Sequence, residues 1–448
     1  MVCSKRRIIF SLIILVIMSW GLTGLLIINL DKLTNHLHLY EDEIERLQGM
    51  ISELKGKMLE NLTIKIGVTA ACDRDYERTR RFFKEIIEKD VNEYCSKINH
   101  GVKFDFIIKN NNGTGGQALE NLYELKNLGI NIIIGHPWSS QCYVSMSYIN
   151  ENNMLLFSSS ASSYQLARSD DNFLRLSPDD MAQARVIAEM LRSRGINAII
   201  VLYIDYEWGV KLFNKLVNEF SKYGGVVEKA IPISRPWEAN ITNCLYEAEA
   251  SAREAVTRYG SKSIAVQLIG AGESALREIV RQAKDYPTLY DLYWFGSHFA
   301  AKNKGFIEEA PEESSHLKIF SPLPTVKESP LYSMLNERYY TLFAEPLDLD
   351  MASRYDIAFI IAEAILEART TDVGKLLEVI PEIASKTFGA SGWCKLDENG
   401  DREMSDYEIW GYGYIDGRVD YIKYGLYDGL RGKIFWYKDN PSRLTSPN

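Results

Sequence analysis

The chain has 448 residues, of which 46% are apolar and 25% are charged. These proportions are those of a globular protein, and the length suits two or three domains better than one compact core. The formal net charge of −9 provides no basic surface for nucleic acid, so we expect no nucleic-acid partner.

The N-terminal segment predicts a membrane anchor. A basic cluster at residues 5–7 precedes an uncharged run from Ile8 to Ile28. As a helix this run spans about 31 Å, which is enough for a bilayer core, and the basic cluster favours a cytoplasmic start. We therefore expect a single-pass cell-membrane protein with residues 1–7 in the cytoplasm, an anchor at 8–29 and an extracellular C-terminal domain. A cleaved secretory signal is the alternative, although its apolar region would be shorter.

Residues 30–60 show a heptad pattern directly after the predicted anchor. This pattern favours a coiled-coil-like stalk, either as a parallel homodimer or as a single helix in a monomer, and the sequence leaves both open. In either case the stalk would lift the following domain off the membrane. Apolar residues occupy the two core positions of the heptad, namely Leu30, Leu37, Ile44, Ile51 and Met58, and Leu33, Tyr40, Leu47 and Leu54.

The chain after the stalk alternates short apolar runs with amphipathic segments. The first four predicted strands are each followed by a turn and a helix, as in a doubly wound parallel sheet. A second series of strands and helices begins after residue 180 and predicts a second α/β lobe. The strands predicted for the first lobe are residues 64–68, 104–108, 132–134 and 154–157.

Serines follow two successive predicted strands. Ser139 and Ser140 come after the strand at 132–134, and a cluster at 158–163 follows the next strand. Ligands of open α/β sheets bind beyond the carboxyl ends of the strands. Helix N-termini there also offer free N–H groups and partial positive charge. The sequence therefore indicates a pocket for a small anion, with simple helix capping as the alternative.

The order of these motifs resembles the periplasmic binding proteins of type I fold, most closely the leucine/isoleucine/valine-binding proteins of ABC transporters. The resemblance covers about residues 63–415. It rests on the strand, the Gly135-x-x-x-Ser-Ser sequence, the serine cluster and Phe173-Leu-Arg-Leu-Ser-Pro178, and continues in Tyr355-Asp356 and Phe388-Gly389. The resemblance implies two doubly wound lobes joined by a three-strand hinge that closes over ligand.

The resemblance also implies the domain boundaries. Lobe one would comprise residues 63–178 and 322–392, and lobe two would comprise residues 179–321 and 393–423. Residues 424–448 would form a C-terminal extension outside the resemblance. The motif Asp397-Glu-Asn-Gly-Asp401 lacks the ligand spacing of a calcium loop and is interpreted as a hairpin turn.

By the same resemblance, Ser139 and the segment Ser160, Ala161 and Ser162 would hold the carboxylate of an amino acid. In the family a tyrosine commonly follows the strand equivalent to residues 264–269, and a glutamate near residues 297–298 pairs with the ligand's ammonium group. This chain has Gly270-Ala-Gly-Glu273 at the first position and His298 near the second. We therefore name Asp205, Tyr206, Glu273 and His298 as the lobe-two candidates, with solvated loop positions as the alternative for the two acids.

Enzymatic motifs are missing from the sequence. There is no G-x-S-x-G at a strand end, no H-E-x-x-H and no phosphate-binding loop, so we predict no enzyme, cofactor or metal site. Five cysteines follow the anchor without a C-x-x-C pair, and their disulfide connectivity stays open.

Together these features predict an extracellular solute-binding protein that captures an amino acid or similar small carboxylate for the permease and ATPase subunits of an ABC importer. The alternative is a sensor ectodomain that reports its ligand to a separate membrane signalling partner.

Overall fold

The computed structural model describes residues 62–98, 101–234, 236–270 and 273–437, together with seven residues between 38 and 47. Within these residues, no helix has the length and apolar character needed to cross a bilayer. The predicted anchor at 8–29 lies outside the described residues, as does most of the predicted stalk. The described stalk residues are helical and exposed, and the dimeric coiled coil stays a prediction.

Lobe one contains a five-stranded sheet in the order β2-β1-β3-β4-β5, and every pair in it is parallel. The prediction of a doubly wound parallel sheet is confirmed. Its central strand β3 is buried along its whole length, as its three isoleucines indicated. The strands are β1 (Thr63–Ala70), β2 (Lys103–Asn110), β3 (Ile132–Ile134), β4 (Leu155–Ser158) and β5 (Phe173–Arg175).

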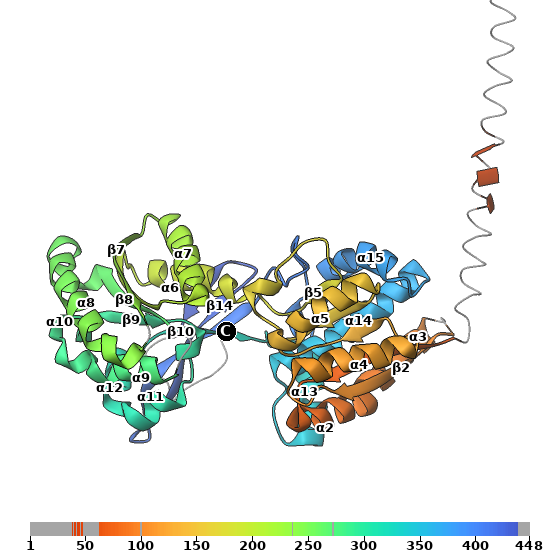
Figure 1. Ribbon diagram of the computed structural model, residues 1–448, viewed down its shortest axis with the longest axis horizontal. Helices are drawn as coiled ribbons and strands as arrows, with labels where there is room; N and C mark the ends of the chain where they lie inside the picture. The colour runs from red at the N-terminus through yellow and green to blue at the C-terminus, as the bar shows by residue number, and fades with distance from the viewer. Residues whose placement is uncertain are drawn as a thin grey trace, which may run out of the picture. The chain divides into compact units, whose positions relative to one another are not determined.

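Helices from two distant parts of the sequence belong to lobe one (Figure 1). The later helices return to it after lobe two is complete, and ring contacts join Phe82 to Tyr339 and Tyr94 to Phe359. The helices are α2 (Asp73–Phe82), which continues through the π-helical turn Phe83–Ile87 into α3 (Glu88–Lys97), then α4 (Gly115–Asn127), α5 (Ser139–Glu151), α13 (Pro330–Phe343), α14 (Leu349–Ala368) and α15 (Val373–Lys386).

Lobe two contains a parallel sheet in the order β7-β6-β8-β9. Side chains alternate across β6, so that Ile200 and Leu202 join one core cluster while Ile199 and Val201 join another. The elements are β6 (Ala198–Ile204), β7 (Val226–Ile233), β8 (Ile264–Ile269) and β9 (Tyr293–Gly296), with α6 (Gln183–Ser193), α7 (Glu207–Ser221), α8 (Trp237–Tyr259), α9 (Glu273–Gln282), α10 (Pro287–Tyr290), α11 (Lys304–Glu309) and α12 (Pro311–Leu317).

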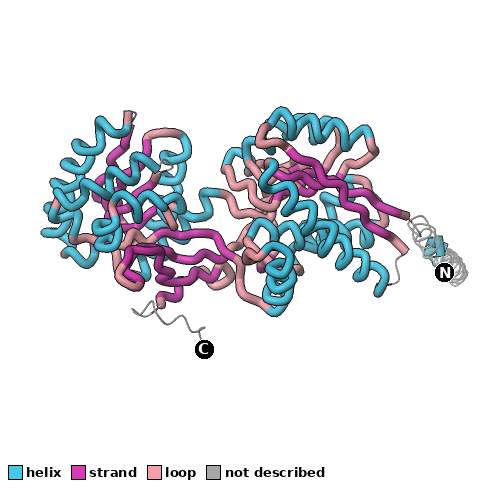
Figure 2. The backbone as a smooth tube through the Cα atoms, turned by 90° about the horizontal axis from the view of Figure 1, so that it is seen from below, coloured by secondary structure: helices cyan, strands magenta, loops and turns pink. Residues whose placement is uncertain are grey.

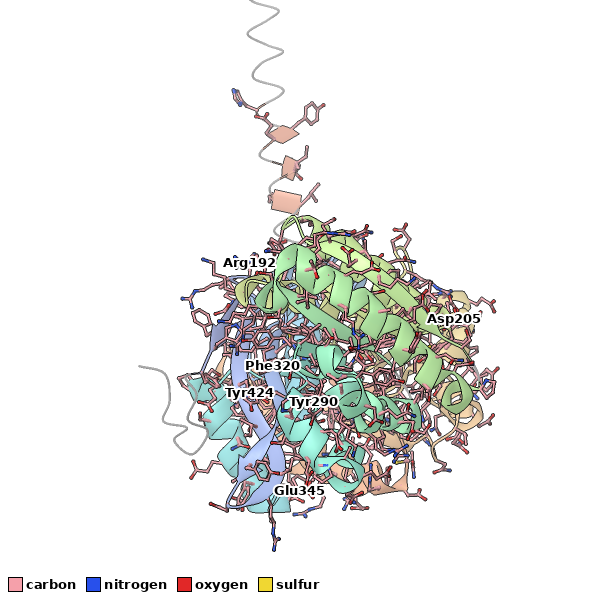
Figure 3. All side chains as sticks on the ribbon, turned by 90° about the vertical axis from the view of Figure 1, so that its left-hand side faces the viewer. Arg192, Asp205, Tyr290, Phe320, Glu345 and Tyr424 are labelled. Carbon is pink, nitrogen blue, oxygen red and sulfur yellow. The ribbon has the colours of Figure 1, made fainter. Side chains whose placement is uncertain are left out.

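An antiparallel sheet in the order β10-β13-β14-β15 continues lobe two, because Phe295 of β9 pairs with Phe320 just before β10. Its strands are drawn in magenta in Figure 2, and Phe320 and Tyr424 lie beside each other on it in Figure 3. The strands are β10 (Ser321–Thr325), β13 (Asp406–Ile415), β14 (Arg418–Asp428) and β15 (Lys433–Trp436), and a separate short hairpin pairs β11 (Phe388–Gly389) with β12 (Gly392–Trp393).

The predicted C-terminal extension therefore begins inside a strand. Position 424 falls in the middle of β14, and β15 pairs with β14 through four residues. The Trp436 indole donates to the Ser193 hydroxyl at 2.9 Å, and the Arg194 guanidinium stacks 3.8 Å from the Trp436 ring. Up to Trp436 this segment is an edge strand of lobe two, held by the end of α6.

The chain passes between the lobes three times, after β5, after β10 and after β12. Two arginines bond the first passage to the third. Arg175 forms a two-point ion pair with Asp401, and Arg402 donates to the carbonyls of Leu176 and Ser391 at 3.2 and 3.1 Å. The motif at 397–401 forms the predicted turn, closed by an antiparallel bridge between Leu396 and Arg402.

The five described cysteines are all unpaired. Four of them are buried, and Cys72 is half-buried at the start of α2. Within the described residues, no group of three or more His, Cys, Asp or Glu side chains is arranged to hold a metal ion.

Candidate functional site

A cavity of about 550 Å³ lies at the carboxyl edge of the lobe-one sheet. Residues that follow β1, β3 and β4 reach it, because parallel strands end at the same edge. The start of α2 and the connection between α13 and α14 complete its wall. The lining residues are Ala71, Cys72, Arg74, Asp75, Glu77, Arg78, Arg81, Pro137, Trp138, Ser160, Phe343, Glu345 and Asp350.

The structure brings the lobe-one candidates together beside this cavity. The Ser139 hydroxyl oxygen accepts from the backbone N–H groups of Ser162 and Ser163 at 3.2 and 3.1 Å. Ser160 lines the cavity, and its hydroxyl donates to the Pro137 carbonyl at 3.1 Å. Ser139 therefore fixes the shape of the loop that carries Ser160, Ala161 and Ser162.

Most hydroxyl protons of the serine cluster are already donated to protein acceptors. Ser158 donates to the His136 carbonyl at 2.6 Å, and Ser159 donates to the Asp350 carboxylate. The Ser139 hydroxyl acts as an acceptor in its hydrogen bonds, so its proton is available to a ligand. Most hydroxyl groups of the cluster therefore stabilise the loop, and the Ser139 hydroxyl can donate to a carboxylate.

Arg175 stabilises this loop through hydrogen bonds to its backbone carbonyls. Its guanidinium donates to the carbonyls of Ala161 and Ser163 at 3.0 and 2.9 Å. The same group pairs with Asp401 at 2.5 and 2.6 Å, and both side chains are almost completely buried. A buried arginine in this position orients the loop because moving the loop would leave charged donors unpaired.

A second buried arginine, Arg354 of α14, pairs with two of the carboxylates that line the cavity. It donates to the Thr79 hydroxyl at 2.8 Å and pairs with Asp350 at 3.0 Å and with Asp75 at 3.2 Å. Burial raises the pKa of Asp75, but the charge of Arg354 and the Ala71 amide outweigh it and leave that pKa below its usual value. The carboxylates of Asp75 and Asp350 are therefore both paired with Arg354 and are not free to bind a ligand.

His298 lies in lobe two, among aromatic and amide groups. Its backbone N–H donates to the Gln183 side-chain oxygen at 2.9 Å, which leaves the Gln183 amide nitrogen facing Nδ1 at 2.7 Å. Burial lowers the pKa of His298 to about 4. The imidazole is thus neutral at pH 7, with its proton on Nε2. Trp208 and Phe299 contact its ring.

The other lobe-two candidates are placed differently. Asp205 is exposed and accepts from the Ser234 hydroxyl at 2.9 Å, and Tyr206 stacks against Trp208. Glu273 is the first residue of α9, and its side chain lies outside the described part of the structure. His298 lines a separate cavity of about 250 Å³ with Leu276, Phe299 and residues 301–304. Of the predicted site residues whose side chains the structure describes, only Ser160 lines the larger cavity.

Asp180 connects the two halves of the site. Its backbone N–H donates to the Ser162 carbonyl at 2.8 Å, and the Ser162 hydroxyl and the Trp208 indole lie near its carboxylate. Burial raises the pKa of Asp180 to about 6, although these two polar groups act in the opposite direction. The sequence interpretation did not include this residue.

Sequence reasoning also missed the charged wall of the cavity. Arg74 and Arg78 come from the first turns of α2, and Glu345 and Asp350 come from a connection about 270 residues later in the chain. The only available signal for the first pair was their position directly after the first predicted strand. Nothing local in the sequence marks the second pair.

Residues 88–414 match the family described as the receptor family ligand binding region. The chain belongs to this family.

An uncharacterized protein of Methanocaldococcus jannaschii is 22% identical over 379 residues, which cover 81% of this chain and 88% of that protein.

Several solved structures share the fold. A substrate-binding protein of an ABC transporter from Desulfitobacterium hafniense, in complex with Leu, has a TM-score of 0.58 at 16% identity and covers 81% of this chain and 100% of its own. An ABC-type branched-chain amino acid transporter protein of Rhodopseudomonas palustris has a TM-score of 0.63 at 14% identity, and the match covers 82% of this chain and 97% of that protein's chain. A solute-binding protein from another strain of that species, in complex with 3,4-dihydroxybenzoic acid, has a TM-score of 0.54 at 15% identity, with 82% and 98% covered. The chain thus has the type I periplasmic-binding fold.

Proposed function

We propose that this protein is an extracellular solute-binding protein that holds an amino acid or a related small carboxylate between its two lobes. The observation that carries the proposal is the convergence of β1, β3 and β4 on one cavity of about 550 Å³, with Ser160 in its wall and Ser139 beside it. A cavity of this size suits a small metabolite. The ligands of two proteins with this fold, leucine and 3,4-dihydroxybenzoic acid, both carry a carboxylate.

The arrangement suggests how the ligand would act. A carboxylate at the lobe-one edge would receive the Ser139 hydroxyl proton, and the passages between the lobes allow lobe two to approach from the other side. A ligand that contacts both lobes stabilises the closed form, which a membrane partner can then recognise. We assign that partner as the permease of an ABC importer with its ATPase, and the predicted N-terminal anchor as the means of keeping the protein at the membrane.

Thermal unfolding tests the binding step. The full chain, purified in a mild detergent, is screened against amino acids and aromatic acids, each paired with its methyl ester. A ligand at 100 times its Kd should stabilise the protein by about 2.7 kcal/mol, a shift of several degrees in Tm. The acid should shift Tm, and the ester should shift it less. If no acid shifts Tm in the wild type, the proposal is wrong.

The importer assignment has its own test. Ligand-loaded protein should accelerate ATP hydrolysis by the permease–ATPase complex of the same organism reconstituted in vesicles, and the same protein without ligand should do so less. Ligand binding without any such acceleration would instead support the sensor alternative, which the family description as a receptor region also fits.

A further inference from the structure

The charged residues that line the lobe-one cavity are paired with protein groups, with two exceptions. Arg78 pairs with Asp348 and Asp75, Arg81 with Glu85, and Glu77 with Arg80. Asp75 and Asp350 are held by Arg354. Within the described residues, Arg74 and Glu345 have no ion-pair partner, and both side chains are exposed.

These two free charges come from different parts of the wall. Arg74 lies in the first turn of α2, where the helix N-terminus adds to its positive charge. Glu345 follows α13, in the connection to α14, and is labelled in Figure 3. Its charge raises the pKa of the neighbouring Tyr339, although burial raises it more. One cation and one anion therefore face a single cavity without satisfying each other.

The other residues that line the cavity determine which ligand can bind between Arg74 and Glu345. The serine cluster has donated most of its hydroxyl protons, so Arg74 is the strongest donor left for a carboxylate. A second negative charge on the ligand would find no further free cation among the described residues of the wall, because Arg78 and Arg81 are already paired with carboxylates. The uncharged wall is partly apolar, with Trp138 44% exposed and Phe343 half-buried.

We propose that lobe one alone binds both charges of a zwitterionic ligand, with the carboxylate on Arg74 and the ammonium group on Glu345. The proposal rests on the function proposed above and narrows its ligand from a small carboxylate to a zwitterion. It also explains how lobe two can carry His298 near the position where the family has a glutamate. With the ammonium group held by Glu345, lobe two needs no anion at that position, and the neutral imidazole can offer Nε2–H to an uncharged part of the ligand.

The test uses the full chain and isothermal titration with single amino acids, together with 4-aminobutyrate and 6-aminohexanoate as zwitterions with separated charges. The tightest probe is then compared with its N-acetyl and methyl ester derivatives. Each derivative removes one charge, and each should bind roughly tenfold or more weakly to the wild type.

Two variants assign the charges to residues. Arg74→Gln should bind the parent probe roughly tenfold more weakly and should no longer distinguish it from its methyl ester. Glu345→Gln should show the same loss and should no longer distinguish it from the N-acetyl derivative. Matched controls are Lys97→Gln on α3, whose partner Glu93 also lies outside the cavity, and Glu337→Gln on α13, because none of these side chains lines the cavity. Both controls should bind like the wild type, with an unchanged Tm confirming that all four variants fold.

The outcomes separate this inference from the proposed function. If a probe binds and neither cavity variant changes its Kd more than the controls do, the zwitterion site is wrong and the solute-binding function stands. If simple monocarboxylates bind as tightly as the best amino acid, the assignment of Glu345 is wrong. If nothing binds the wild type, both proposals fail.

Discussion

The two lobes present different chemistry at the edges where a ligand would bind. The lobe-one edge is built from buried ion pairs, in which Arg175 and Arg354 hold loops and carboxylates in place. In lobe two, the neutral His298 imidazole is contacted by an amide and by aromatic rings, and Lys302 and Lys304 line the same cavity. Rigid charged groups suit recognition of a ligand's charges, whereas neutral and aromatic groups can close over it without a desolvation cost for charge. This difference supports the proposal that lobe one recognises the charges of the ligand and that lobe two closes over it.

The largest expected effect comes from breaking the lobe-one network. Arg175→Ala removes one partner of a buried pair and leaves Asp401 buried without compensation, so the free energy of unfolding should fall by about 3–5 kcal/mol. Urea unfolding at pH 7 measures it. Arg80→Ala is the control, because Arg80 also pairs with a carboxylate but the side chains of Arg80 and Glu77 are 45% and 63% exposed, and it should cost far less. Equal losses in the two variants would contradict a special role for the buried pair.

The pH dependence of His298 tests the neutral character of the lobe-two edge. The pKa of about 4 in the folded protein lies below the unfolded value of about 6.5, so its contribution to stability is complete above pH 6.5 and is lost as pH falls toward 4. By pH 4.5 the wild type should lose about 2.5 kcal/mol through this group. His298→Gln should lose correspondingly less between pH 8 and pH 4.5 in urea unfolding. Identical losses in both proteins would show that the imidazole is not held neutral.

The contribution of Asp180 to stability should change with pH in the opposite direction to that of His298. Its folded pKa of about 6 lies above the unfolded value of about 3.9, so its stabilising contribution is complete at low pH and is lost as pH rises through 6. Asp180→Asn should therefore gain about 2 kcal/mol relative to the wild type when the pH is raised from 4 to 7. Differential scanning calorimetry at the two pH values measures this gain, and a constant difference between the proteins would refute it.

The smallest expected effect belongs to Ser139. Ser139→Ala removes the acceptor for the backbone N–H groups of Ser162 and Ser163, and should lower the free energy of unfolding by about 1 kcal/mol. Ser140→Ala, at the next and more exposed position, should stay within about 0.5 kcal/mol of the wild type. If Ser140→Ala destabilises as much as Ser139→Ala, the two serines act only as parts of the helix start.

The sequence was sufficient to predict that the serines of lobe one converge. The alternation of apolar runs and the order of the predicted strands place the ends of β3 and β4 side by side. Ser139 and Ser160 come shortly after these two ends, so they are expected to lie close together. Their hydrogen bonds could not be predicted, because a serine pattern does not tell whether a hydroxyl donates to a ligand or to a neighbouring carbonyl. The structure shows that Ser158, Ser159 and Ser160 all donate to the protein.

The charged wall could not be predicted because it depends on chain segments that meet only in the folded protein. Glu345 and Asp350 reach the cavity through α13 and α14, which return to lobe one after lobe two is complete. The tail was difficult for a similar reason. Residues 424–428 belong to β14, which pairs with β13, and residues 433–436 pair with β14, so this segment extends a sheet beyond the residues that the resemblance covers.

The arginine bonds between the first and third passages also determine where the molecule can bend. Arg175 and Arg402 cross-link these passages on the lobe-one side, through Asp401 and the Leu176 carbonyl. Rotation of lobe two must therefore occur beyond them, between Ser177 and Asp180 on the first passage and after Arg402 on the third. The serine loop would keep its shape through this motion, whereas Asp180 would exchange neighbours. A change in its surroundings would shift its pKa, so a change in proton binding would accompany such a motion.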